Sequence, residues 1–370
     1  MTRAFSSWFS CLVGCSLLAC AGRSLDLDQA GSAGTASVNG GPAVSATRLR
    51  HEMIDFWADD ERIYFSDTYT FNLQSCVYDN CNATYVSYGS STGPVNTTAN
   101  DVFFGAATEA NSYKTGLPSG ILRCPKQGCG GAPENFIRTG SAAAPVTDAS
   151  YFYWSSTFDI FRCRLTGCPE VPETVVRGQT STGTIAVLGA NLYWWAVTND
   201  DTATSGQESH LYSAPIDGSA AAQQLTLTGP DPSGLIYAEP AIAVSATGLY
   251  WIEAGQKIMT CPLEGCGDRA ATALVSTDTP KQKLWVDDRG LYWLDSDGFS
   301  GYQNLITGKV LFWPLAGCAA GEAPRALTPN AVRKFVLDSQ YVYWNAPDGT
   351  STADPYGVDQ LIYRVAKPAN

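Results

Sequence analysis

Cysteine is the reactive residue type with the most regular spacing in this chain of 370 residues. Twelve cysteines are present, and eight of them form four pairs in which four residues separate the thiols: Cys76/Cys81, Cys124/Cys129, Cys163/Cys168 and Cys261/Cys266. Residues that flank a four-residue hairpin loop face one another with Cα atoms about 4.5 Å apart, close to the lower end of disulfide geometry. The spacing therefore predicts four local disulfides in an exported chain. Zinc is the alternative, and it requires cysteine pairs from different turns to meet.

Few other patterns in the sequence could do chemistry. The two histidines, His51 and His210, lie in no recognisable triad or metal motif. Residues 89–93 match the G-x-S-x-G pattern, but no helix is predicted to follow them, so we interpret the match as chance. The net charge of −12 argues against a nucleic-acid surface, which needs clustered Lys and Arg. These features favour a protein that is not an enzyme and has no nucleic-acid partner.

The N-terminus predicts export. Arg3 precedes an apolar stretch, residues 5–19, that is too short to span a bilayer and is typical of a signal peptide. The stretch ends at Leu17-Leu18-Ala19-Cys20, which resembles a bacterial lipoprotein cleavage box. We therefore expect residues 1–19 to be removed, Cys20 to be lipidated, and the membrane to be contacted only through this anchor, with the outer membrane as the favoured location. Two alternatives remain: lipidation at Cys15, or ordinary signal cleavage that releases a secreted protein.

Residues 20–45 are rich in Gly, Ala and Ser and contain no aromatic residue, which is typical of a flexible tether. The segment would hold a folded domain at a distance from the anchor. Whether that domain faces the periplasm or the cell exterior is left open by the sequence.

The elements that position the cysteines form a repeat. An aromatic pair closes an apolar run seven times, at intervals of 39 to 57 residues, and the last residues of the pairs are Phe65, Phe104, Trp154, Trp194, Trp251, Trp293 and Trp344. Each of the first six units contains four short β-rich runs, a pattern typical of one propeller blade. Residues 46–370 are therefore predicted to form an all-β, seven-bladed β-propeller with four-stranded blades; a β-sandwich or two small barrels are the alternatives. Because the seventh unit stops after its third run, we expect residues 46–50 to supply its fourth strand.

The repeat resembles a known group of proteins. The segments VDDRGLYWLD (residues 286–295) and KIMTCPLEGCG (residues 257–267) are similar to the repeats of secreted bacterial β-propellers with YWTD-like cores and C-P-x-x-G-C turns, many of them lipoproteins of unassigned activity. The resemblance spans about residues 46–366 and implies fold and export, but no ligand. Units one and two depart from it: Tyr64-Phe65 and Phe103-Phe104 replace Tyr-Trp, and the turn at residues 76–81 lacks Pro and Gly.

Candidate binding residues lie on the connections between the second and third strands, which are longest in units two, four, six and seven. Such connections share one face of a propeller, and long loops are where function usually lies. They place aromatic residues beside carboxylates, a combination that suits a sugar or Ca²⁺. The candidates are Tyr113, Trp195, Asp200, Asp201, Asp295, Asp297, Tyr302, Asp348, Asp354 and Tyr356. No cofactor is expected, with Ca²⁺ as the alternative, and the interpretation of these residues as solvated loops stays open.

The sequence favours a monomeric cell-envelope lipoprotein whose propeller binds a protein or glycan through the long-loop face. The alternative is a propeller enzyme, a hydrolase or lyase acting on a sugar, lactone or polyuronate with an axial divalent metal. A structural scaffold in an envelope assembly is a third interpretation. Cys318 has no C-x4-C partner, because Trp313 stands at the corresponding position, and we expect a buried free thiol or a crosslink to another chain.

Overall fold

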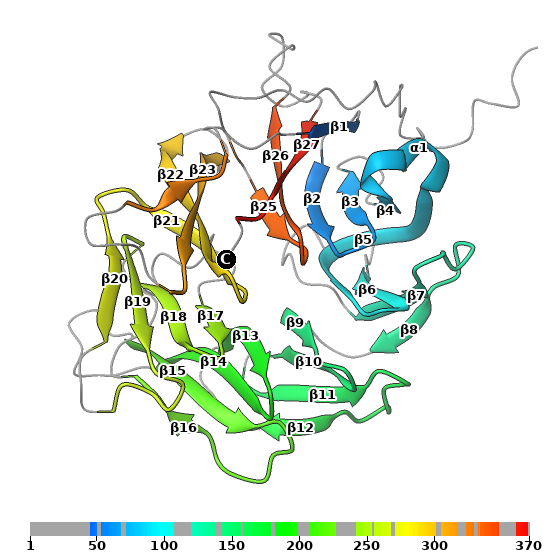
Figure 1. Cartoon of the computed structure of the whole chain (residues 1–370). Coiled ribbons are helices and arrows are strands. Elements are labelled where there is room, and N and C mark those ends of the chain that lie inside the picture. The colour runs from blue at the N-terminus through cyan, green and yellow to red at the C-terminus, as the bar shows by residue number, and fades with distance from the viewer. Residues whose placement is uncertain are drawn as a thin grey trace, which may run out of the picture.

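The structure is a computed structural model. It describes residues 45–49, 53–67, 72–106, 120–137, 143–156, 158–178, 182–198, 208–226, 242–253, 255–267, 271–300, 305–316, 323–328, 332, 334–347 and 360–368. Within these ranges the chain is a ring of seven four-stranded antiparallel sheets that radiate from a centre (Figure 1). The only helical segments in the described chain are η1 (Tyr78–Asn80) and α1 (Cys81–Thr84).

The sheets follow the chain in order, and each is one blade. Blade 1 contains β2 (Met53–Ala58), β3 (Ile63–Asp67), β4 (Asn72–Cys76) and the first half of β5 (Val86–Thr97). Blade 2 contains the second half of β5, β6 (Asp101–Ala106), β7 (Ile121–Pro125) and β8 (Glu134–Ile137). Blade 3 contains β9 (Ala143–Thr147), β10 (Tyr151–Ser155), β11 (Ile160–Arg164) and β12 (Glu173–Val176). Blade 4 contains β13 (Thr182–Leu188), β14 (Asn191–Thr198), β15 (Glu208–Pro215) and β16 (Gln223–Gln224).

The remaining blades keep the same order. Blade 5 contains β17 (Ile242–Ser245), β18 (Gly248–Glu253), β19 (Lys257–Cys261) and β20 (Thr272–Ser276). Blade 6 contains β21 (Lys281–Val286), β22 (Gly290–Ser300), β23 (Leu305–Pro314) and β24 (Arg325–Ala326). Blade 7 contains β25 (Lys334–Leu337), β26 (Tyr341–Pro347), β27 (Gln360–Ala366) and β1 (Ser45–Leu49). The predicted all-β, seven-bladed propeller is confirmed.

The ring is closed by the N-terminal strand. β1 pairs antiparallel with β27, with Ala46 opposite Tyr363 and Leu49 opposite Gln360. The last blade therefore combines three C-terminal strands with one N-terminal strand, and the predicted closing role of residues 46–50 is confirmed for the described part, residues 46–49. This pairing joins two segments that lie more than 300 residues apart in the chain.

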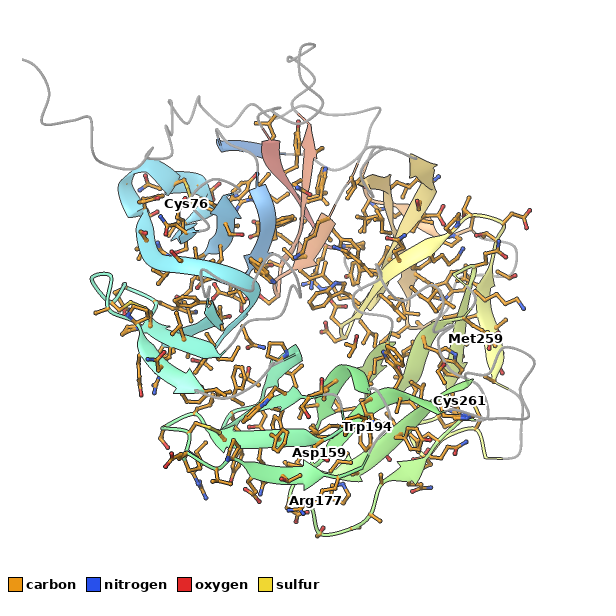
Figure 2. All side chains as sticks on the ribbon, turned by 180° about the vertical axis from the view of Figure 1, so that it is seen from behind. Cys76, Asp159, Arg177, Trp194, Met259 and Cys261 are labelled. Atoms are coloured by element: carbon orange, nitrogen blue, oxygen red, sulfur yellow. A yellow bond between two sulfur atoms is a disulfide. The ribbon has the colours of Figure 1, made fainter. Side chains whose placement is uncertain are left out.

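The core consists of seven apolar clusters, each shared by two neighbouring blades. The aromatic pairs explain this arrangement. In the cluster between blades 4 and 5, for example, Tyr193 of blade 4 meets Trp251 of blade 5, whereas Trp194 packs in the cluster between blades 3 and 4. Successive residues of a strand point to opposite faces, so one pair serves both neighbouring interfaces. Figure 2 shows Trp194 among the side chains that fill the space between sheets.

The turns between first and second strands are fixed by carboxylates. In blades 1, 3, 6 and 7 one oxygen of Asp59, Asp148, Asp287 and Asp338, respectively, accepts hydrogen bonds from the backbone N–H groups two and three residues on. This is the local bonding that makes Asp a frequent turn residue. In three of these blades the second oxygen accepts from the buried Tyr hydroxyl five residues on, at 2.7–2.8 Å.

Blade 6 differs from the sequence-based expectation of a long loop. β22 and β23 continue as a paired ribbon until Ser300 lies opposite Leu305, so only residues 301–304 connect the two strands. The register shifts between Ser296 and Phe299, which marks a bulge where the ribbon leaves the blade. The extra residues of this unit therefore lengthen two strands.

Removal of β1 should destabilise the whole ring. We expect a chain that begins at residue 52 to lose about 3 kcal/mol in the free energy of unfolding, because several hydrogen bonds of the β1–β27 ladder are lost, each contributing about 0.5–1.5 kcal/mol. Chemical denaturation measures the difference. A chain that begins at residue 44 keeps β1 and is the matched control; equal stability of the two chains would contradict a closing role for β1.

Candidate functional site

The topology separates two faces of the ring. The turns between first and second strands and between third and fourth strands lie on one face, called here the turn face. The connections between second and third strands, and from each fourth strand to the next blade, lie on the other, called here the loop face. The two faces differ in how their residues are held, and this difference is the basis for locating a site.

Disulfides hold the turn face. Cys76–Cys81, Cys124–Cys129, Cys163–Cys168 and Cys261–Cys266 are each bonded within one blade, with Cα–Cα distances of 4.7 to 5.4 Å. The four bonds belong to blades 1, 2, 3 and 5, at the turns that follow the third strands. The cysteine pairs therefore lie apart from one another. A shared zinc site would require two pairs to meet.

The glycine of the C-P-x-x-G-C turn allows close contact between blades. Gly265 has φ +94°, and a Cβ placed there would lie 2.6 Å from the carbonyl oxygen of Leu225 in blade 4. The N–H of Cys266 donates to that same oxygen at 3.0 Å. Any larger residue at position 265 would therefore push the turn away from the preceding blade.

Buried ion pairs reinforce two of the interfaces on the turn face. Lys126 of blade 2 lies 2.9 Å from Asp59 of blade 1, and Lys367 of blade 7 lies 2.6 Å from Asp287 of blade 6. Burial raises the pKa of both carboxyls, but the lysine partner and the turn N–H groups outweigh it, so each pKa lies below its usual value. Lys126 and Lys367 each come directly after the third strand of their blade. The same position of the repeat therefore contacts the first turn of the preceding blade in blades 2 and 7.

In blade 1 the same position carries Tyr78, within the turn that departs from the C-P-x-x-G-C pattern. Its hydroxyl donates to the carbonyl of Ile362 in blade 7 at 3.0 Å, and its ring meets Tyr343 edge-on. Arg364 lies between the rings of Tyr78 and Tyr341, 4.3 and 4.4 Å from their centroids, and is bonded to Asp79. The unusual turn is therefore the one that packs across the closure of the ring.

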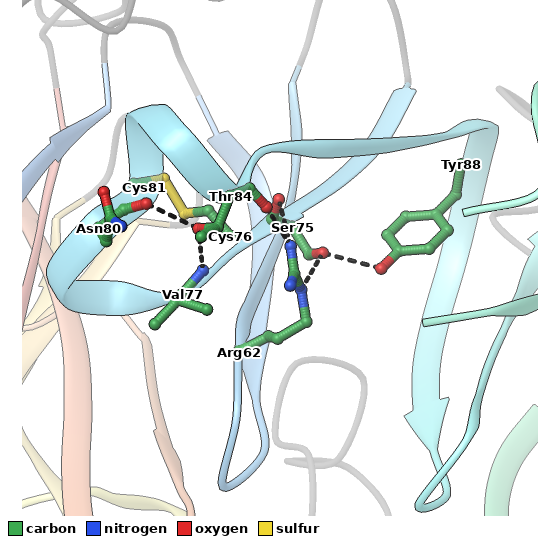
Figure 3. Close-up of a disulfide and its surroundings, with 8 residues drawn as sticks. All are labelled: Arg62, Ser75, Cys76, Val77, Asn80, Cys81, Thr84 and Tyr88. Atoms are coloured by element: carbon green, nitrogen blue, oxygen red, sulfur yellow. Dashed lines mark hydrogen bonds between the residues drawn. A yellow bond between two sulfur atoms is a disulfide. The ribbon is translucent and has the colours of Figure 1, made fainter. Parts of the chain in front are cut away.

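The helical geometry of this first turn has its own supports (Figure 3). The Thr84 hydroxyl accepts from the N–H of Val77 and donates to the carbonyl of Asn80, which closes the turn around the disulfide. Arg62 donates to the Ser75 hydroxyl at 2.8 Å and to the carbonyl of Thr84. Side-chain hydrogen bonds here support a turn that lacks the Gly found before the second Cys of the other three disulfide turns.

The loop face holds the candidate ligand residues, and most of them lie outside the described residues: Tyr113, Asp200, Asp201, Tyr302, Asp348, Asp354 and Tyr356. Asp297 belongs to β22, but its side chain is outside the description. Cys15, Cys20 and Cys318 also lie outside it. Trp195 and Asp295 are described in full; they belong to blades 4 and 6, which are not neighbours in the ring, so the structure does not bring these two together.

Trp195 is half-buried on β14, opposite Leu211. It packs against the cluster between blades 4 and 5, and its buried indole N–H has no hydrogen-bond partner in the described part of the chain. A buried donor of this kind is costly unless it is bonded. Trp195 therefore combines a packing role with an unused polar group near the loop face.

Asp295 is engaged inside the protein. It is 8% exposed, accepts a hydrogen bond from the Thr279 hydroxyl at 2.7 Å, and lies 3.7 Å from the ammonium of Lys281. The side chain of Lys281 is fully buried and also donates to the Thr277 hydroxyl and the Thr279 carbonyl. Burial lowers the pKa of Lys281, and Asp295 opposes that effect. This group fixes the base of the blade 6 ribbon to the innermost strand.

Cations on the innermost strands were missed by the sequence analysis. Among the described innermost strands, the charged residues are Asp55, Lys281, Lys283 and Lys334, so lysine predominates in blades 6 and 7. The Lys334 ammonium lies 4.4 Å from the centroid of Trp57 across the interface between blades 7 and 1. Lys283 has φ +51°, the one positive φ outside glycine in the described chain, at a bulge of β21. A lysine at the start of a strand is usually exposed to solvent, so the sequence did not indicate that these lysines are held inside the protein.

The described residues contain no group of three or more His, Cys, Asp or Glu side chains placed to hold a metal ion. Separately, the described part of the chain has no helix of the length and apolar character that crossing a membrane requires. The disulfides suggest an extracellular or periplasmic protein, because such bonds persist in oxidising compartments.

Known structures support the fold. No protein-family model matches the chain, and no curated protein matches it. The β-propeller domain of the trilobed protease from Pyrococcus furiosus is similar over 85% of this chain and 96% of its own, with TM-score 0.57 and 8% identity. Streptogramin B lyase is similar over 87% of this chain and 97% of its own, with TM-score 0.54 and 8% identity. PorZ of Porphyromonas gingivalis, a surface component of the type-IX secretion system, is similar over 88% of this chain and 39% of its own, with TM-score 0.52 and 12% identity. At these identities the likeness shows the fold alone.

The Asp59–Lys126 pair should contribute measurably to stability. We expect Asp59→Asn to lower the free energy of unfolding at neutral pH by about 2–3 kcal/mol, because the buried Lys126 then keeps only its longer ion pair with the largely exposed Glu61, at 3.4 Å. Denaturant titration measures the loss, and Glu264→Gln, at an exposed turn carboxylate of blade 5, is the control.

The same pair gives a pH dependence with a defined sign. A carboxyl whose pKa is lowered by folding stabilises the native state above its ordinary pKa, 3.8 for Asp59, and loses that contribution as the pH falls through the folded-state value. The difference between the Asp59→Asn variant and the original chain should therefore shrink below pH 3.8. A difference that is constant with pH would contradict the role assigned to this charge.

Proposed function

We propose that this chain is an exported, lipid-anchored binding module that holds a protein or glycan partner on its loop face and acts as a monomer. The observation that carries the proposal is the contrast between the two faces. The turn face is occupied by internal bonds: four disulfides, the aspartate-fixed turns and two buried ion pairs. The disulfides and aspartates hold single turns, and the two ion pairs join neighbouring blades.

The loop face carries the elements that extend beyond a minimal blade. The blade 6 ribbon continues to Ser300, and in blade 4 the pairing of β14 with β15 runs on until Thr198 lies opposite Glu208. Extra length on a rigid scaffold is where binding residues are commonly placed. The buried Lys281–Asp295 pair fixes the end of the blade 6 ribbon that joins the blade. A ribbon fixed in this way loses less conformational entropy when a partner binds.

PorZ, which has a similar fold over 39% of its chain, is a bacterial surface component, so this fold occurs in proteins of that location. The disulfides support an oxidising compartment. The proposed anchor is Cys20, which would attach the propeller through the tether of residues 20–45.

Photo-crosslinking from defined positions tests the binding face. A benzophenone amino acid at Phe158, which is 57% exposed, or at the exposed Gln256 would sample the loop face between the long connections. We expect adducts of discrete mass from both positions in intact cells, because a partner on this face brings its C–H bonds within reach. Glu264 and Asp288, exposed on the turn face, are the matched controls. Equal adducts from the control positions, or none from Phe158 and Gln256, would reject the proposed face.

Metabolic labelling tests the anchor. Cys20→Ser should abolish incorporation of labelled palmitate and move the protein from the membrane fraction to the soluble fraction, because the acylated thiol is lost. Cys15→Ser should leave both properties unchanged. The reverse outcome would place the anchor at Cys15, and labelling of neither residue would mean that the chain is released after ordinary signal cleavage.

A further inference from the structure

A groove lies on the rim of the ring between blades 2 and 3. Its volume is about 340 Å³, and it is lined by all four residues of β8 and by Cys168, Pro169, Glu170 and Pro172 of blade 3. Successive side chains of a strand point to opposite faces, so a cavity that contacts all four residues of β8 must run along the edge of that strand. The groove therefore follows the main chain of blade 2.

β8 is the outermost strand of its blade, and its outer edge pairs with no other strand in the described chain (Figure 1). The opposite wall offers few main-chain donors, because Pro169 and Pro172 have no N–H group. The N–H and C=O groups along the outer edge of β8 are thus left for a ligand, and an open edge of this kind can accept an added strand.

The groove exists because one turn stands away from its neighbour. The corresponding glycines of blades 2, 4 and 5 would each bring a Cβ within 4 Å of the preceding blade: Gly128 near Val86, Gly218 near Val175, and Gly265 near Leu225. In those interfaces the turn covers the outer strand. A Cβ at Gly167, the equivalent residue of blade 3, would meet no atom of the described residues within 4 Å. The interface between blades 2 and 3 is therefore open where the other three are closed.

The charge of the groove is negative. Glu134 has a side chain that is 62% exposed and lies 3.9 Å from Arg123, whose closer partner is Asp101 at 2.7 Å. Glu170 is exposed at the opposite wall. Glu173, just beyond the groove, is bonded by Arg162 and is not available. The adjacent Val171 is 81% exposed and offers an apolar contact beside the two carboxylates.

We propose that this rim groove binds an extended basic peptide segment of a partner protein, which adds to β8 as a fifth strand of blade 2. Main-chain hydrogen bonds to β8 would supply affinity, Glu134 and Glu170 would select lysine or arginine side chains, and Val171 would pack against an apolar residue between them. The site is separate from the loop face, so the proposed function can fail while this inference holds, and the reverse.

A labelled octapeptide of alternating lysine and valine is the probe for the full mature chain. We expect fluorescence anisotropy to show binding, and hydrogen exchange to slow at the amides of residues 134–137. The Glu134→Lys/Glu170→Lys variant should bind about tenfold more weakly at low salt, because two attractive charges become repulsive. The Glu264→Lys/Asp288→Lys variant has the same change in net charge on the turn face and should bind as the original chain does.

Two further peptides separate strand addition from simple charge attraction. A peptide that is N-methylated at every backbone amide keeps the lysines but has no N–H group to donate from either edge, and it should not bind. A peptide of alternating glutamate and valine should not bind either. Absence of binding by the lysine peptide, equal binding by the Glu134→Lys/Glu170→Lys variant or by the N-methylated peptide, or protection confined to residues outside 134–137 would each overturn the proposal.

Discussion

The whole ring depends on one geometric constraint, the alternation of side chains along the second strand of each blade. Because two adjacent aromatic residues point in opposite directions, the first joins the cluster with the next blade and the second joins the cluster with the preceding one. Tyr292 and Trp344 thus meet between blades 6 and 7, and Tyr343 and Phe65 meet where the ring closes. No blade can bury its own pair alone, so the sheets are stable only as neighbours, and the closing strand β1 completes the last of them.

The fold was predictable because its signals are local and repeated. The Tyr-Trp pairs and C-x4-C spacing recur in register with the strands, and the truncated seventh unit points to the closing strand. Contacts between blades were not predictable from the sequence. One position of the repeat is occupied by Lys126, Lys367 or Tyr78 in different blades, and each of these residues contacts a group of the preceding blade, which the repeat pattern does not identify. The blade 6 ribbon is not predictable from sequence, because the polar residues from Ser296 to Gly301 do not show the alternation typical of a strand. For the candidate site, the sequence predicts which face carries the long connections but not the contacts of single residues. Asp295, for example, is held by Lys281, which lies on another strand more than ten residues away.

The two faces of the molecule follow from a division of polar groups. On the turn face, bonds to lysines and backbone N–H groups lower the pKa of Asp59 and Asp287 despite their burial. Burial, together with the neighbouring aspartates, raises the pKa of Tyr64 and Tyr343. Toward the loop face, the innermost strands of blades 6 and 7 carry lysines instead. Two of these lysines are held by groups of the protein itself, since Lys281 is buried beside Asp295 and Lys334 lies over the ring of Trp57.

The register of β1 also determines where the chain enters the ring. Ser45 lies opposite Arg364, near the end of β27 on the turn face, and Leu49 lies opposite Gln360, at the start of that strand on the loop face. The N-terminal end of β1 therefore lies on the turn face. A segment joined to the N-terminal end of β1 would therefore leave the ring on the disulfide-bearing face, opposite to the face on which the ribbons of blades 4 and 6 extend.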